Sequence, residues 1–225
     1  MIDLSARADD PEALDLGVPP EEALRSLADL RFVNRWLGNR RRFAAVVLPF
    51  LRGSERPRLL DVGCGSGDVP GVLRRALDGR LAAAAVDIKL LHLQAAPREL
   101  LRVVADARVL PFAPGTFDVV TASLFLHHFD KAELPALLRS LFALARRALV
   151  VNDLRRAHVP YLFGKAVFPM LFRSRVSVED GLVSIRRSFR EAELRVAFAA
   201  AGVPSVRIER NWPYRLLAVA EHARA

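Results

Sequence analysis

The chain has 225 residues, 52% of them hydrophobic, which is enough to bury the core of one domain with modest additions. No run of about 18 apolar residues occurs and no basic-then-apolar leader opens the sequence, so we expect neither a membrane span nor a signal peptide. The single cysteine, Cys64, has no partner for a disulfide, and no Cys/His spacing is typical of zinc; we expect a cytoplasmic protein without a metal. The net charge of +9 comes mostly from arginines that are scattered along the chain without stacking aromatic residues, so nucleic acid is not an expected partner.

The first 54 residues divide into two parts. Residues 1–20 are polar, contain prolines and show no periodicity, which predicts a flexible N-terminal segment. Residues 21–54 carry apolar side chains at helical spacing and predict a helical cap made of two helices, with a break near Gly38–Asn39.

From Arg58 onward, short apolar runs alternate with segments of helical spacing. Strands are expected at 58–62, 81–88, 101–106, 117–123 and 148–153. Helices are expected between them, at 67–79 and 131–147. Strands that are apolar on both faces belong in a parallel sheet covered by helices, so residues 55–225 are expected to form one doubly wound α/β domain.

The alternation stops after Asp153. Residues 155–189 are too long for a normal connection and too apolar for an exposed loop, which predicts an inserted segment. A helix at 190–202 and two strands, around 205–211 and 214–222, are expected to complete the domain.

The stretch "LLDVGCGSGDVP", Leu59–Pro70, follows directly on the first predicted strand. Glycines at the carboxyl end of such a strand let the backbone turn tightly and approach a ligand. Gly63 and Gly65 match the dinucleotide fingerprint G-x-G-x-x-G, but Asp68 stands at its third glycine. Asp61 precedes the loop, and a carboxylate there repels a pyrophosphate and attracts an ammonium group. A nicotinamide-dependent dehydrogenase is therefore disfavoured.

Three further segments accompany this loop in order: "AAVDI", "VVADARVLPF" and "TASLFLHHF". Over roughly residues 58–153 the set resembles the class I S-adenosylmethionine-dependent methyltransferases, in the form found in small-molecule enzymes for quinone precursors and polyketide-type aromatics. The resemblance implies an α/β fold: a doubly wound, Rossmann-like, mostly parallel seven-stranded sheet with an N-terminal helical cap and a lid insertion after strand 5, at about 155–189. It also implies S-adenosyl-L-methionine as cofactor and S-adenosyl-L-homocysteine as its product.

The same resemblance implies roles for individual residues. The cofactor-binding residues would be Asp61, Gly63, Cys64 and Gly65 at the methionine end, Asp87 at the ribose, Ile88, Asp106 and Ala107 at the adenine, and Ser123 and Leu124 beneath the sulfonium. Cys64 is expected to be a small filler and not a nucleophile.

His127 and His128 follow the fourth predicted strand and are the candidate catalytic bases, because imidazole suits a hydroxyl acceptor near neutral pH. The expected acceptor is a small apolar molecule, hydroxylated aromatic or quinone-like, and oxygen is the expected site of methylation; transfer to carbon or nitrogen stays open because no residue distinguishes them. Candidate contacts to an anionic group are Arg35, Trp36, Arg173 and Arg175. Two alternatives stay open: a nucleic-acid methyltransferase and a catalytically silent cofactor-binding protein. The oligomeric state is also open, with a homodimer among the possibilities.

Overall fold

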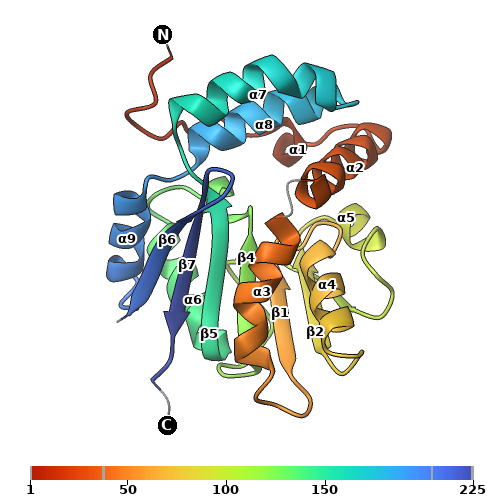
Figure 1. Ribbon diagram of the computed structural model, residues 1–225, viewed down its shortest axis with the longest axis vertical. Helices are drawn as coiled ribbons and strands as arrows, with labels where there is room; N and C mark the ends of the chain where they lie inside the picture. Colours follow the sequence, from red (N-terminus) through yellow and green to blue (C-terminus); the bar gives the residue numbers. More distant parts are fainter. Residues whose placement is uncertain (1, 37–38, 204, 224–225) are drawn as a thin grey trace.

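A seven-stranded sheet lies at the centre of the computed structural model, which describes residues 2–36, 39–203 and 205–223 (Figure 1). The strands are β1 (Arg58–Val62), β2 (Ala82–Asp87), β3 (Leu101–Val104), β4 (Phe117–Ser123), β5 (Ala145–Leu154), β6 (Val206–Asn211) and β7 (Arg215–Glu221). Their order across the sheet is β3-β2-β1-β4-β5-β7-β6, and β7 alone among these seven runs in the direction opposite to the other six. The predicted doubly wound, mostly parallel sheet is confirmed.

Helices cover both faces of this sheet and also the edge formed by the carboxyl ends of its parallel strands (Figure 1). They are α1 (Ala13–Leu16), α2 (Pro20–Trp36), α3 (Asn39–Leu51), α4 (Asp68–Ala76), α5 (Leu90–Gln94), α6 (Leu134–Leu144), α7 (His158–Leu171), α8 (Arg175–Arg187) and α9 (Glu191–Ala200), with a short 3-10 turn η1 (Leu126–His128). The two faces have separate cores because successive strand residues point to opposite sides. Leu60 packs with α6 and α9, whereas Leu59 packs with α3 and α4.

The chain reverses its course through the sheet at β1. From β1 it first builds outward to β2 and β3, and it then returns to add β4 on the other side. Such a switch point leaves a crevice at the carboxyl ends of the strands, where ligands bind in open α/β sheets. Gly63 follows β1 at this edge, Asp87 ends β2 and Ser123 ends β4.

The inserted segment 155–189 forms two helices, α7 and α8, which lie side by side across this edge together with α1 and α2 (Figure 1). The predicted helix 131–147 is too long, since residues 145–147 belong to β5. Among the described residues no helix is both long and apolar enough to cross a membrane.

The front of the chain differs from the expectation in two respects. First, only α2 lies in the cap position: α3 packs on the face of the sheet, where Phe43, Val47 and Leu51 are fully buried. Gly38, one of the two residues at the predicted helix break, lies outside the described residues.

Second, residues 2–20, expected to be flexible, are packed against the lid. Leu4 is 2% exposed, its carbonyl accepts a hydrogen bond from Arg156 Nε at 3.1 Å, and the Ala13 N–H donates to Asp180 Oδ1 at 2.7 Å. A segment without periodicity is ordered here because distant side chains satisfy its backbone, a condition that composition does not reveal.

Candidate active site

The glycine loop between β1 and α4 has the strained backbone that only glycine adopts easily. Gly63 and Gly65 have φ angles of +63° and +51°. The Gly65 N–H donates to Asp87 Oδ2 at 3.0 Å, which ties the loop to the end of β2. A side-chain carbon added at Gly65 would lie 4.0 Å from its nearest neighbour, a Leu27 methyl, so this face of the loop is open.

A cavity of about 210 Å³ lies above this loop and under the lid. Eight predicted site residues line it: Asp61, Gly63, Cys64, Gly65, Ser123, Leu124, His127 and His128. The lid side contributes apolar walls from Phe168, Phe172 and Ile185. The other four predicted residues, Asp87, Ile88, Asp106 and Ala107, lie outside this cavity, at the ends of β2 and β3.

Asp87 is buried, and each of its carboxylate oxygens accepts a backbone hydrogen bond, from Gly65 and from Lys89. Ile88 beside it is 60% exposed, which leaves an apolar surface uncovered. Asp106 follows β3 and holds Arg108, whose hydrogen bonds lower the pKa of the Asp106 carboxyl. The ends of β2 and β3, which pair with each other, therefore form a second part of the candidate site next to the glycine loop.

Asp61, the acid before the glycines, is 3% exposed and accepts one hydrogen bond, from Thr121 Oγ1 at 2.7 Å. Burial raises the pKa of the Asp61 carboxyl to about 7, and this hydrogen bond offsets only part of the increase. The carboxylate thus has unused acceptor capacity facing the cavity. Burial also raises the pKa of the Cys64 thiol, and its sulfur packs against the core, as expected of a filler.

His127 is held between two carboxylates. Its Nδ1 lies 2.7 Å from Asp153 Oδ1, and its Nε2 lies 3.4 Å from Glu12 Oε1. Burial by itself would lower the pKa of His127, but Asp153 and then Glu12 more than compensate and raise it to about 10. His127 is therefore an imidazolium at neutral pH and has no free position for another proton.

His128 has a different environment. Its side chain is 26% exposed, its Nδ1 lies 2.8 Å from Asp15 Oδ2, and its Nε2 is 4.0 Å from Glu12 Oε2. Glu12 and the two histidines place ligand atoms within 4.8 Å of one another, close enough to share a metal ion. A protonated His127 has no free lone pair, so a metal ion would have to displace a proton from that ring to bind there.

Sequence reasoning missed Glu12, Asp15 and Arg215. Glu12 and Asp15 come from the segment expected to be flexible, although their spacing of three residues places two acids on one helical face. Arg215 begins β7 and lines the cavity. Of the arginines singled out for an anionic group, Arg35, Arg173 and Arg175 are exposed and none lines the cavity; the side chain of Trp36 is outside the described part of the chain.

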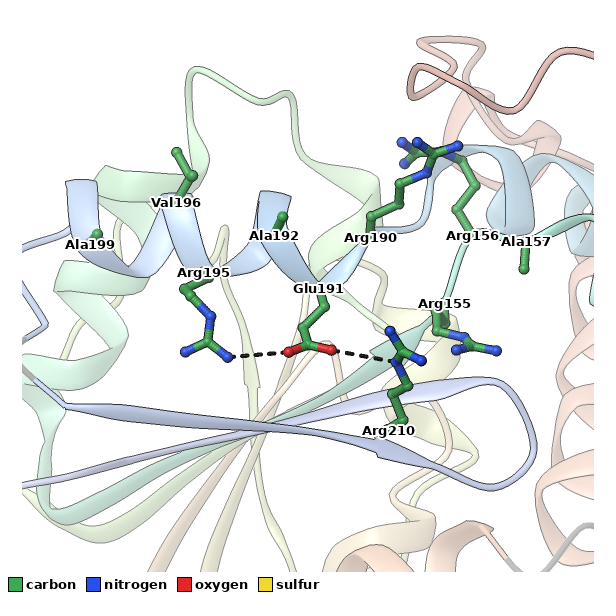
Figure 2. A pocket seen from close by; sticks show the side chains of 10 residues that line it. All are labelled: Arg155, Arg156, Ala157, Arg190, Glu191, Ala192, Arg195, Val196, Ala199 and Arg210. Carbon is green, nitrogen blue, oxygen red and sulfur yellow. Dashed lines mark hydrogen bonds and ion pairs between the residues drawn. The ribbon is translucent and has the colours of Figure 1, made fainter.

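A second, wider hollow of about 780 Å³ lies between α9 and the start of the lid (Figure 2). Five arginines line it: Arg155, Arg156, Arg190, Arg195 and Arg210. Figure 2 shows Glu191 between two of them, with ion pairs of 3.3 and 3.4 Å to Arg195 and Arg210. No predicted cofactor or catalytic residue lines this hollow, so we place the chemistry in the smaller cavity.

Comparison with known proteins bears on the fold and on the family of the central segment. Residues 59–148 match the model of a family described as a methyltransferase domain, whereas no curated protein matches the chain. A SAM-dependent methyltransferase from Aquifex aeolicus is similar in structure, with a TM-score of 0.58 at 17% identity over 79% of this chain and 87% of that one. The plantazolicin methyltransferase BpumL gives a TM-score of 0.67 at 12% identity over 91% and 98%. Magnesium protoporphyrin IX methyltransferase from Synechocystis gives 0.57 at 19% identity over 85% and 87%. At such identities the structural likeness establishes the fold.

The residues at the sheet edge fit S-adenosylmethionine. The buried Asp61 carboxylate suits an ammonium group, the open face of Gly65 permits close approach, and exposed Ile88 offers an apolar surface for a base. The family match covers the strands that carry these residues, and the strand order is the one the motifs imply. Residues 59–148 are a methyltransferase domain, the chain has the fold of the S-adenosylmethionine-dependent methyltransferases, and S-adenosylmethionine is the cofactor.

Proposed function

We propose that this methyltransferase acts on a small, apolar, hydroxylated aromatic or quinone-like acceptor, and that it methylates an oxygen. The observation that carries the proposal is a single cavity bounded below by the glycine loop and above by Phe168, Phe172 and Ile185. An apolar wall opposite polar groups that can orient a ligand is typical of sites for small molecules. Two structural neighbours are methyltransferases named for plantazolicin and for magnesium protoporphyrin IX, and the second of these names supports a small-molecule acceptor.

The cofactor roles proposed for the chain follow the motif positions. Asp61 and the amides of the glycine loop hold the methionine end, Asp87 accepts from the ribose hydroxyls, and Asp106 with the Ala107 amide holds the adenine beside Ile88. Ser123 and Leu124 lie under the position of the sulfonium. The cofactor supplies an activated methyl group, so the protein's own task is to align the acceptor and exclude water.

His128 is the proposed general base, and His127 is a positioning residue. We assign His127 no base role because an imidazolium held by Asp153 and Glu12 has no free position for the acceptor's proton. His128 also lines the cavity. With a proton on Nδ1 donated to Asp15, its Nε2 lies 4.0 Å from Glu12 Oε2, beyond hydrogen-bonding distance, and can accept a proton. His128→Gln should lower kcat more than it changes KM. An unchanged kcat would exclude this assignment.

The lid is proposed to move during binding. A cavity of about 210 Å³ is smaller than the roughly 300–1,000 Å³ of most small-molecule sites, yet it must admit part of a nucleoside and an acceptor. Helices α7 and α8 and the segment around Glu12 form its roof, so their displacement is the route of entry.

The decisive experiment is a transfer assay with labelled methyl donor and a panel of phenols, quinols and matched aryl amines, read by mass spectrometry. We expect methyl ethers from phenols or quinols and little product from amines. Products methylated on nitrogen or carbon would overturn O-methylation. Tight S-adenosylhomocysteine binding without turnover of any acceptor would favour the silent cofactor-binding alternative.

The arginine-lined hollow favours one second candidate, a nucleic-acid methyltransferase. Such an enzyme should bind RNA with an affinity that falls steeply with salt, because phosphate contacts release counterions. Filter binding at about 50 and 200 mM salt separates the two, since the small-molecule proposal predicts no such binding.

A further inference from the structure

Arg215 lies at the edge of the cavity of about 210 Å³ under the lid. It is the first residue of β7, paired in register with Leu154 of β5 and Asn211 of β6. The residue is 5% exposed and lines the cavity. Because β7 runs antiparallel to β5, its first residue lies at the same sheet edge as the carboxyl ends of β4 and β5.

The guanidinium of Arg215 is buried, and two of its three nitrogens lack a hydrogen-bond partner among the described residues. Its Nε and Nη1 make no hydrogen bond to any of the described residues. Asp153, the carboxylate whose charge acts on it, is already engaged: Oδ1 accepts from His127 Nδ1 and the Leu154 N–H, and Oδ2 accepts from the His127 N–H. Burial lowers the pKa of Arg215 to about 10, so the group is still charged at neutral pH. A desolvated, unpaired charge is costly in a folded protein and is retained where a ligand completes it.

Two hydroxyls on the roof of the same cavity share this condition. Ser26 Oγ on α2 and Ser177 Oγ on α8 are buried and have no hydrogen-bond partner within the part of the chain that the structure describes. Buried polar atoms normally find partners, so three such side chains around one cavity indicate a polar ligand group there. By contrast, Arg31, the other arginine that lines the cavity, lies 3.7 Å from Asp68.

We infer that Arg215 binds an oxyanion on the acceptor, a carboxylate or an ionised phenol, through Nε and Nη1. This inference rests on the proposed function and narrows its substrate class to acidic aromatics. Arg215 lies two strands from the end of β4, where Ser123 and Leu124 mark the site of transfer, and two strand spacings amount to about 10 Å. The bound oxyanion is therefore a group other than the oxygen that receives the methyl, and Arg215 is a specificity-determining residue.

The first test uses the protein without ligand. If Arg215 were a structural ion pair, Arg215→Met would lower the melting temperature. An unpaired buried charge predicts the opposite, so we expect the melting temperature to rise or to stay level, while Arg215→Lys stays level or falls. A fall of several degrees in Arg215→Met would overturn the inference. Arg210→Gln, which removes an exposed arginine ion-paired with Glu191 in the other hollow, is the matched control.

The second test measures binding to protein saturated with S-adenosylhomocysteine. The probes are 3- and 4-hydroxybenzoate and the corresponding neutral hydroxybenzamides, titrated calorimetrically at pH 6 and pH 9. We expect the benzoates to bind, Arg215→Met to weaken them by roughly tenfold or more, and Arg210→Gln to leave them unchanged. Carboxylate recognition predicts benzoate binding at both pH values, whereas phenolate recognition predicts that the amides bind only at pH 9.

Three results would refute the inference. They are equal benzoate affinity in the wild type and Arg215→Met, no binding of any probe by the wild type, and a loss of S-adenosylhomocysteine affinity in Arg215→Met, which would assign Arg215 to the cofactor's own carboxylate. If the wild type fails to bind S-adenosylhomocysteine at all, the proposed function fails instead, so the two failures are distinguishable.

Discussion

Replacement of Asp61 by Asn should stabilise the protein above pH 7 while it weakens cofactor binding. The substitution removes the buried charge and keeps an oxygen that can accept from Thr121 Oγ1. The pKa of the Asp61 carboxyl is about 7 in the folded chain against 3.8 for the free side chain. Between these values the folded state keeps a proton that the unfolded state releases, so the wild type loses stability as the pH rises. Three pH units at 1.4 kcal/mol each give a penalty of about 4 kcal/mol, complete above pH 7 and absent below about pH 4.

Urea unfolding of both proteins at pH 5 and pH 8, without ligand, measures this difference. We expect the advantage of Asp61→Asn to be several kcal/mol at pH 8 and much smaller at pH 5. Asp118→Asn is the matched control. Asp118 is a fully buried acid near the amino end of β4, away from the cavity, but its carboxylate accepts hydrogen bonds from Arg146 at 2.7 Å and from the Arg58 N–H. That substitution should destabilise. Equal stability of wild type and Asp61→Asn at pH 8 would refute the argument.

Three further substitutions test the site. Asp87→Ala should abolish S-adenosylhomocysteine binding in calorimetry while the circular dichroism spectrum stays native; unchanged affinity contradicts the ribose role. The raised pKa of His127 means that its ion pairs stabilise the fold fully below pH 6.5 and are lost as the pH rises through about 10. Wild-type stability should therefore fall between pH 6.5 and 10, and less so in Asp153→Asn. Gly65→Ala should cost about 1 kcal/mol and also block the cofactor, whereas Gly79→Ala, at a φ of +77° in open space, should cost as much and bind normally.

The cofactor half of the site was predictable because its signals are local. Each motif ends a strand of a parallel sheet, and parallel strands bring their carboxyl ends to one edge whatever the loops between them do. Gly63, Asp87 and Ser123 are therefore placed together by strand order alone. The face on which α3 packs was not predictable, since a helix with a buried apolar side looks the same in a cap and in a covering layer.

The acceptor half depends on contacts between distant segments. Glu12 reaches His127 across 115 positions of the chain, and Ser184 Oγ donates to the same Glu12 carboxylate at 2.5 Å. The polar, proline-containing sequence of the N-terminal segment gives no indication that lid residues will hydrogen-bond to its backbone. The protonated state of His127 was hidden for the same reason, because it arises from Asp153 and Glu12 together.

The reversed direction of β7 has an evolutionary consequence. Because this strand begins where its neighbours end, a residue more than 60 positions beyond the last cofactor segment reaches the reaction chamber. In the proposed role, a substitution of Arg215 changes which acidic acceptor binds without changing the residues that bind the cofactor. Descendants of one such gene can thus diverge in acceptor while their signature motifs stay identical.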